Sequence, residues 1–196
     1  NTIINFTSDN GCSPEANYPE LATYGHNPSY IFRGHKADIY EGGHRVPLLV
    51  QWPARIQAGT VVEETVCLVD LLATMAHILD ITLPDDAGED SVSNLNAWLG
   101  KSGSPLREAT VHHSVKGNFS IRQGKWKLEL CPGSGGWSYP KPGEEPEDAL
   151  PIQLYDLSSD IGERTNVALE HPDVVKQLEQ LLQQYIESGR STPKSC

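Results

Sequence analysis

Basic residues are scarce in this chain. Its 196 residues include 15 Lys and Arg against 26 Asp and Glu, which gives a formal net charge of −11. A surplus of negative charge repels a phosphate backbone, so the composition argues against general nucleic-acid binding. Long apolar runs are also missing, because runs such as residues 46–50 fall far short of a membrane span. We therefore expect neither nucleic acid nor a membrane among its partners.

Closely spaced cysteines are absent as well. The four cysteines are Cys12, Cys67, Cys131 and Cys196, and none forms a C-x-x-C pair. A cysteine zinc site is therefore not expected, whereas two disulfides of undefined pairing are allowed. The chain begins at Asn1 without an initiator Met or a basic-then-apolar signal segment. This start indicates a piece of a longer protein or a processed chain.

The first half of the chain has the pattern of an α/β domain. Residues 3–6 and 46–52 are nearly continuous apolar runs, typical of strands buried on both faces of a parallel sheet. Residues 12–45 between them follow neither a strand period nor a helix period, which predicts a long, ordered, functional loop. Apolar spacings of three and four predict a helix over residues 66–79, with Asp70 as its cap.

The pattern changes after the breaker-rich residues 100–105. Strand-like runs follow at residues 109–113, 118–122, 125–131 and 152–157. Residues 123–124 are Gln-Gly, a tight hairpin signal, so we expect an antiparallel meander. Residues 172–187 form the clearest amphipathic helix in the chain. We therefore divide the chain into an α/β part over 1–104 and an α+β subdomain over 105–196.

A carboxylate and a carboxamide stand together at Asp9 and Asn10, directly after the first apolar run. In open α/β sheets ligands bind beyond the carboxyl ends of strands, and adjacent side-chain oxygens suit a hard cation such as Ca²⁺ or Mg²⁺. The alternative is a plain Asx turn, in which both side chains bond the nearby backbone. The dipeptide alone favours the turn.

Residues 33–45 gather basic and titratable side chains and three glycines just before the second apolar run. In an acidic chain this cluster predicts an anion site, where Lys36 would act as a point charge and an arginine as a fork for oxyanions. The glycines would let backbone N–H groups approach the anion. The alternative is a solvated charged loop with a Gly-Gly turn, and spacing alone does not separate the two.

Five segments resemble, in the same order, sequence motifs of the type I sulfatase family. They read F-T-S-D-N-G at 6–11, K-x-x-x-Y-E-G-G-x-R-V-P at 36–47, V-D-L-x-x-T at 69–74, R-x-G-K-W-K-L at 122–128 and L-Y-D-L-x-x-D-x-x-E-x-x-N at 154–166. Five matches in family order are strong support, whereas any one alone would be weak. Residues 25–36 and 133–140 most resemble bacterial sulfatases of the N-acetylgalactosamine-6-sulfatase type.

The resemblance implies a fold, a chemistry and a set of site residues. The fold is the α/β, alkaline-phosphatase-like sulfatase fold, here its C-terminal part, with a four-stranded antiparallel sheet and a long C-terminal helix. The family residues matching Asp9 and Asn10 ligate Ca²⁺, and the one matching Lys36 holds the sulfate group. The implied substrate is a sulfated carbohydrate or an aryl sulfate, and the implied location of the complete protein is secreted or periplasmic.

Four further side chains are candidate substrate contacts. His26 lies in the long loop, where it could contact sugar hydroxyls. His35 flanks Lys36 and could line the anion site, with a bond to the backbone of the loop as its alternative. His113 ends a predicted strand, with a structural or exposed role as its alternative. Trp137 lies in a Gly-rich loop, where aromatic rings stack on sugars; the alternative is a ring that pins the loop to the core.

One part of the family pattern is missing. Sulfatases need a formylglycine made from the Cys or Ser of a C/S-x-P/A-x-R motif, and residues 12–16 read C-S-P-E-A, with Ala16 in place of Arg. The resemblance places the nucleophile upstream of Asn1. We therefore expect the C-terminal part of a sulfatase, with weak Ca²⁺ binding, no turnover by itself and self-association through exposed sheet edges. The alternatives are a non-catalytic metal- or glycan-binding remnant, or part of a phosphate or phosphonate ester hydrolase of the same superfamily.

Overall fold

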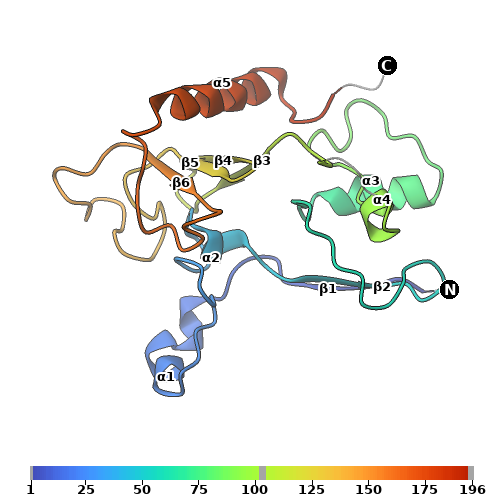
Figure 1. Ribbon diagram of the computed structural model, residues 1–196, viewed down its shortest axis with the longest axis horizontal. Coiled ribbons are helices and arrows are strands. Elements are labelled where there is room, and N and C mark those ends of the chain that lie inside the picture. Colours follow the sequence, from blue (N-terminus) through green and yellow to red (C-terminus); the bar gives the residue numbers. More distant parts are fainter. Residues whose placement is uncertain (1, 102–104, 194–196) are drawn as a thin grey trace. The chain divides into compact units, whose positions relative to one another are not determined.

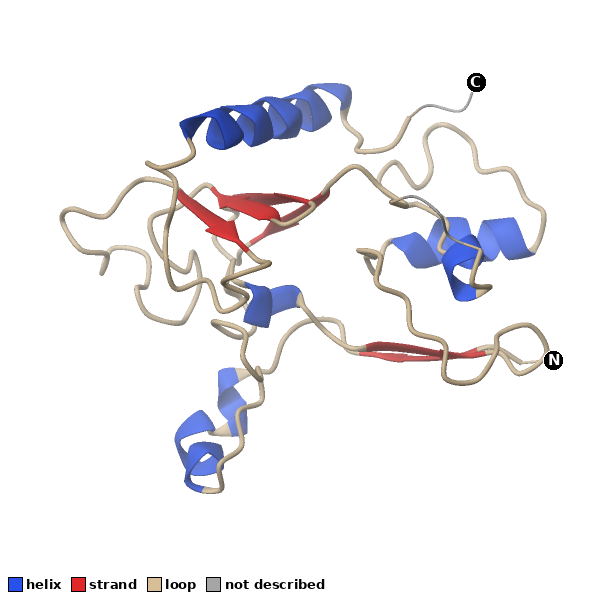
Figure 2. Cartoon of the chain, viewed as in Figure 1, coloured by secondary structure: helices blue, strands red, loops and turns tan. Residues whose placement is uncertain are grey.

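The structure, a computed structural model, describes residues 2–101 and 105–193. The chain splits into two compact units that interleave along the sequence. The first unit consists of Asn1–Thr7, Leu48–Thr110 and Gln183–Cys196, and the second consists of Ser8–Pro47 and Val111–Leu182. The division expected from the sequence follows chain order, whereas these units exchange segments. Figures 1 and 2 trace the elements of each unit.

The first unit contains a two-stranded ribbon of β1 (Ile4–Thr7) and β2 (Leu48–Gln51), in which Phe6 is opposite Leu49. The two strands are antiparallel, so the prediction of a parallel sheet is wrong for this pair. The prediction of burial is also wrong, because Ile4, Phe6 and Leu49 are 55%, 65% and 58% exposed. In the described part of the chain no third strand joins the ribbon. An apolar strand is buried only where other elements pack on both of its faces, and the sequence of the strand does not show whether they do.

The helices of the first unit are α3 (Asp70–Ile78) and α4 (Leu95–Trp98). α3 starts later than the apolar spacing predicts, and the expected apolar face is partly exposed, with Leu72 and Leu79 open to solvent. The side chain buried at the start of α3 is Asp70.

Asp70 does not cap α3, contrary to the prediction. Its carboxylate accepts the backbone N–H of Cys67 at 2.8 Å and of Val92 at 3.0 Å, and it pairs with the Arg107 guanidinium. Cys67 lies within the residues expected as helix, but in the structure it precedes α3 and is half-buried. A carboxylate next to an arginine in the fold gains more from this non-local pairing than from a cap.

The second unit is built on a four-stranded antiparallel sheet in the order β3-β4-β5-β6, which confirms the predicted meander. The strands are β3 (Thr110–His113), β4 (Phe119–Gln123), β5 (Trp126–Glu129) and β6 (Gln153–Asp156). Gly124 turns the hairpin between β4 and β5 with a φ of +57°, the left-handed conformation that a tight turn requires. The long helix α5 (Pro172–Ser188) runs along the sheet, as Figure 1 shows.

The sheet buries two chemically different faces. The register places Ile121, Leu128 and Leu154 side by side on one face, and all three are fully buried. α5 contributes an apolar stripe of its own, whose buried members are Val175, Leu178, Leu181 and Leu182. The alternate residues of the same strands, among them Lys127 and Tyr155, form the opposite face, which is polar and equally buried.

The long segment before β2 is ordered by short helices. It contains η1 (Pro14–Ala16), α1 (Tyr18–Thr23) and α2 (Glu41–His44). Helices of this length are too short to show an amphipathic period, so the sequence predicts only a loop. Within the described residues no helix is both long enough and apolar enough to cross a membrane.

Candidate functional site

Two segments of the second unit meet at glycines. The Gly11 N–H donates to the Gly43 carbonyl at 2.9 Å, and the Lys36 N–H donates to the Cys12 carbonyl at 3.0 Å. A Cβ atom on Gly11 would lie 1.8 Å from the Gly42 carbonyl oxygen, so only glycine permits this approach. The contact brings the segment that follows β1 against the loop that carries Lys36.

Asp9 and Asn10 lie directly before this contact. The Ser8 hydroxyl donates to the Asn10 carbonyl at 2.8 Å. Within residues 2–101 and 105–193, the side chains of Asp9 and Asn10 make neither a hydrogen bond nor an ion pair, so the structure does not form the Asx turn that the dipeptide alone favours. Two adjacent side-chain oxygens are therefore uncommitted.

These oxygens fit part of a Ca²⁺ shell. The ion takes about six to eight oxygen ligands, and Asp9 and Asn10 supply only some of them. The part of the chain that the structure describes brings together no group of three or more His, Cys, Asp or Glu that would hold a metal ion. The donor set thus suits a hard cation but is incomplete on these residues alone.

Lys36 lies in a tight turn between His35 and Asp38, in which the Asp38 N–H donates to the His35 carbonyl at 3.0 Å. Ala37 has a φ of +83°, a left-handed conformation that costs free energy for any residue except glycine. Such strain persists only where the surroundings hold it, so the direction of the chain at Lys36 is set by contacts around the turn.

The predicted substrate contacts fall in different places. The His35 ring Nδ1 lies 3.0 Å from the Lys36 carbonyl oxygen, so His35 is held in the same turn. Trp137 is 45% exposed on a loop whose preceding residues, Gly133–Gly136, are buried. A Cβ atom on Gly136 would lie 2.5 Å from the Ala37 carbonyl oxygen, so the Trp137 loop packs directly against the Lys36 turn.

His113 and His26 are less closely tied to this arrangement. The His113 ring Nδ1 lies 3.0 Å from the Ser114 carbonyl oxygen, and the ring meets Phe119 edge-on at 6.4 Å between centroids. His26 is exposed after α1, and its backbone N–H donates to the Leu21 carbonyl at 3.1 Å. The structure thus brings His35 and Trp137 to Lys36, and it links His26 to the site by no hydrogen bond among the described residues.

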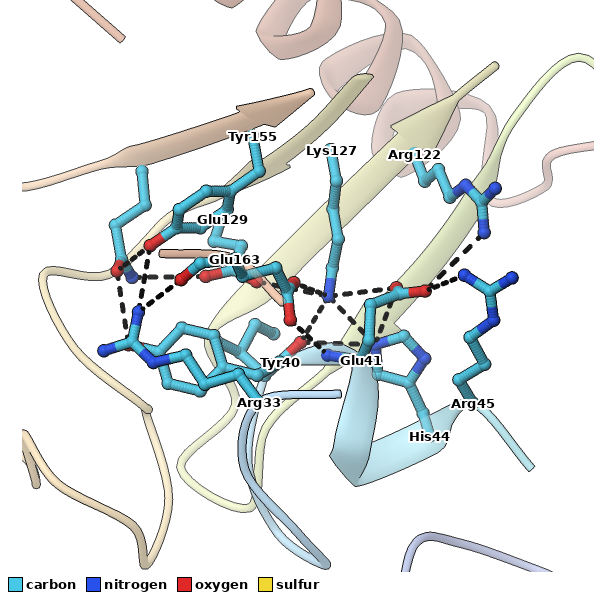
Figure 3. Close-up of polar contacts among 12 residues, drawn as sticks. Arg33, Tyr40, Glu41, His44, Arg45, Arg122, Lys127, Glu129, Tyr155 and Glu163 are labelled. Carbon is cyan, nitrogen blue, oxygen red and sulfur yellow. Dashed lines mark hydrogen bonds and ion pairs between the residues drawn. The ribbon is translucent and has the colours of Figure 1, made fainter. Parts of the chain in front are cut away.

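A buried charge cluster between α2 and the sheet is the largest feature that sequence reasoning missed (Figure 3). Lys127 is fully buried, and its Nζ lies 2.6 Å from Glu163, 3.2 Å from Glu129 and 3.3 Å from Glu41. The Nζ also donates to the Ile39 carbonyl at 2.9 Å. The signal available in the sequence was one charged residue inside each of three of the quoted motifs, namely Glu41, Lys127 and Glu163.

The cluster sets the charge of its members. Burial alone would raise the pKa of Glu41, but Lys127 and two arginines outweigh it and hold this pKa below its usual value. Burial would lower the pKa of Lys127, but the three carboxylates outweigh it and raise this pKa. Burial lowers the pKa of His44 well below its usual value, and the neighbouring His112 and Lys127 lower it further.

The cluster connects the sheet to the glycine contact. The Glu163 Oε2 accepts the Glu41 N–H at 2.7 Å, which satisfies a donor in the first turn of α2. Arg45 returns to Glu41 at 3.0 Å from the other end of the same short helix. α2 is therefore fixed at both ends, and its Gly43 carbonyl receives the Gly11 N–H.

Comparisons with known proteins identify the family. The sulfatase family profile matches residues 1–81. An N-acetylgalactosamine-6-O-sulfatase of Bacteroides thetaiotaomicron is 38% identical over 186 residues, which cover 93% of this chain and 36% of that protein. Human arylsulfatase A is 33% identical over 195 residues, covering 92% and 37%.

Solved structures agree. One solved structure, whose description concerns the metabolism of multiple glycosaminoglycans by B. thetaiotaomicron, has a TM-score of 0.80 at 35% identity. The match covers 94% of this chain and 38% of that one. A Pseudoalteromonas sulfatase has a TM-score of 0.72 at 22% identity, covering 100% and 39%, and shows the fold alone. The neighbours confirm the expected alkaline-phosphatase-like fold. This chain spans little more than a third of these relatives. It belongs to the sulfatase family and corresponds to the C-terminal part of a sulfatase.

Proposed function

We propose that this chain is part of an enzyme that hydrolyses sulfate esters of glycans. The observation that supports the proposal is the glycine contact, which brings the segment that follows Asp9 and Asn10 against the loop of Lys36. A cation and an ammonium group placed together suit the negatively charged oxygens of a sulfate ester. The relative named N-acetylgalactosamine-6-O-sulfatase supports a sulfated amino sugar as the substrate.

The residues present would divide the work as follows. Asp9 and Asn10 would supply part of the Ca²⁺ shell, and a bound Ca²⁺ supplies positive charge for the oxygens of the ester. The Lys36 ammonium binds the sulfate oxygens as a point charge. The sugar that carries the sulfate is contacted by the side chains of His35, His113, Trp137 and His26.

The nucleophile in this proposal is a formylglycine from the rest of the enzyme. Nowhere does the sequence carry the C/S-x-P/A-x-R motif from which this residue is made. Covalent catalysis needs an activated nucleophile, so the chain of 196 residues by itself should not turn over a sulfate ester. For the complete protein we propose a secreted or periplasmic location, as for sulfatases in general.

The decisive experiment uses the complete gene product that contains this chain. Release of sulfate is measured from N-acetylgalactosamine 6-sulfate and from an aryl sulfate, before and after treatment with EDTA. Lys36→Ala should abolish most of the release, and Lys176→Ala, on the exposed side of α5, is the matched control and should leave it unchanged. Release of phosphate from a phosphate ester in place of sulfate would favour a related hydrolase. Binding of Ca²⁺ or glycan without any hydrolysis would favour a non-catalytic module.

We also propose that the isolated chain self-associates through its ribbon of β1 and β2. The exposed side chains of Ile4, Phe6 and Leu49 and the open strand edges favour pairing with a second ribbon. Sedimentation should show oligomers of the 196-residue chain, and Phe6→Lys should shift them toward monomer. A wild-type chain that sediments as a monomer and melts cooperatively would contradict this proposal.

A further inference from the structure

Asp38 carries a carboxylate that the second unit buries completely. Its side chain is 0% exposed, and it lies two residues after Lys36. Among residues 2–101 and 105–193 no lysine or arginine forms an ion pair with it, and only the His35 ring approaches, at 3.5 Å. A buried carboxylate is costly unless hydrogen bonds satisfy it, so the donors around Asp38 show what it holds.

These donors come from two segments. Oδ1 accepts the N–H of Trp137 at 2.7 Å and of Ser138 at 3.0 Å. Oδ2 accepts the N–H of His35 at 2.9 Å and the hydroxyl of Ser138 at 2.5 Å. One oxygen therefore holds the loop that presents Trp137, and the other also reaches the turn that carries Lys36.

Backbone hydrogen bonds hold the Lys36 turn as well. The Ile39 N–H donates to the Ser134 carbonyl of the Trp137 loop at 2.8 Å, and the Val115 N–H, from the segment after β3, donates to the Ala37 carbonyl at 2.9 Å. A Cβ atom on Gly136 would lie 2.5 Å from Asp38 Oδ1. These contacts surround the left-handed Ala37 and explain how its strained conformation persists.

We propose that Asp38 is a positioning residue that fixes the Lys36 turn to the Trp137 loop. The amine that binds the sulfate group and the ring that faces the sugar then form one rigid site. This inference rests on the proposed function, in which Lys36 holds sulfate and Trp137 contacts the sugar. Hydrogen bonds to a charged acceptor are stronger than those to a neutral one. Because a small displacement of a binding group greatly weakens the binding of its ligand, Asp38 acts on sulfate through the position of Lys36.

Two variants separate the halves of this arrangement. In Asp38→Asn one oxygen becomes an NH₂ group, which donates hydrogen bonds. The Ser138 hydroxyl can accept such a bond, whereas the His35 N–H is itself a donor and cannot. We therefore expect the NH₂ group at the Oδ2 position, so that the Trp137 loop keeps its acceptor and the Lys36 turn loses its own. Ser138→Ala removes one hydroxyl donor and leaves the three N–H donors in place, which makes it the matched control.

The readout is binding of inorganic sulfate, measured by calorimetry on the complete gene product. Asp38→Asn should weaken sulfate binding about tenfold or more, because a buried donor is left without its charged acceptor. Ser138→Ala should change it much less. In a Lys36→Ala background Asp38→Asn should add nothing, because residues that act through one another are not additive. A purely structural role would instead give additive losses.

Hydrogen exchange on the unmutated protein is a second readout that does not depend on the folding of any variant. Saturating inorganic sulfate should slow amide exchange at residues 35–38 and also at residues 134–138. Protection confined to the first segment, unchanged sulfate affinity in Asp38→Asn, or additive losses in the double variant would each overturn the inference. Unchanged sulfate affinity in Lys36→Ala would overturn it together with the role of Lys36.

The two proposals fail in different ways. A gene product that binds sulfate in the expected pattern, but releases none from any ester, contradicts the proposed function and leaves the role of Asp38 intact. A gene product that hydrolyses sulfate esters with unchanged KM in Asp38→Asn contradicts the role of Asp38 alone.

Discussion

Replacement of Lys127 by methionine tests whether the buried charge cluster holds α2 to the sheet. The Lys127 ammonium is fully buried and contacts Glu163 at 2.6 Å and Glu41 at 3.3 Å. Glu41 would keep Arg45 at 3.0 Å, whereas Glu163 would lose its contact at 2.6 Å and keep the Glu41 N–H. Because one partner of a buried ion pair is removed, we expect a loss of about 3–5 kcal/mol in the free energy of unfolding.

Lys125→Met is the matched control on the adjacent turn. Lys125 also pairs with a carboxylate, Asp156 at 2.6 Å, but its side chain is 50% exposed. Exposed pairs contribute little, so this variant should melt close to the wild type. Urea denaturation at pH 7, followed by circular dichroism, measures both variants. At pH 5 the loss in Lys127→Met should shrink, because protonation relieves the carboxylates left without a counter-charge. Equal losses in the two variants would refute the reasoning.

Three further outcomes are expected. His44→Phe should flatten the fall in stability between pH 7 and pH 5, since the pKa of His44 is lowered in the folded state and the unfolded chain therefore takes up the proton first; an unchanged slope in a pH series of melts would contradict this. Gly11→Ala should lower Ca²⁺ affinity and stability, because its Cβ would meet the Gly42 carbonyl at 1.8 Å. Gly162→Ala, whose Cβ would have its nearest neighbours at 3.3 Å, should change both much less in calorimetry and melting. Trp137→Phe should remove the largest share of the acrylamide-quenchable tryptophan fluorescence, because Trp52 and Trp98 are buried and Trp126 is half-buried. Quenching unchanged from the wild type would show that the loop does not present this ring.

The elements that the sequence predicts well are those with local causes. The turn at Gly124 and the alternation in β4 and β5 fix a hairpin within one short segment, and the stripe of α5 repeats over several turns. Both were predicted within a few residues. The short helices of the long loop carry no such repeat, so only their glycines and aromatic residues indicated order.

The elements that the sequence predicts poorly depend on distant partners. Asp70 has the right chemistry for a cap, yet Arg107 and the Val92 N–H take its carboxylate. Lys127 is a residue type that is almost always exposed, and two of the partners that make its burial possible, Glu41 and Glu163, are remote in the chain. At Asp9, Asn10 and Lys36 the residues themselves left a plain turn and a solvated loop open, and only the family resemblance favoured a site. The glycine contact between their two segments is one that no local pattern reports.

The two-faced sheet also guards its own strand alignment. Ile121 and Leu128 face α5, while Arg122 and Lys127 face the carboxylates. A slip of one residue between β4 and β5 would turn every side chain of the moved strand to the opposite face. It would drive an ammonium among leucines and a leucine among carboxylates at once. A misaligned hairpin therefore loses stability on both faces of the sheet, so the chemical contrast between the faces selects the correct register of β4 and β5.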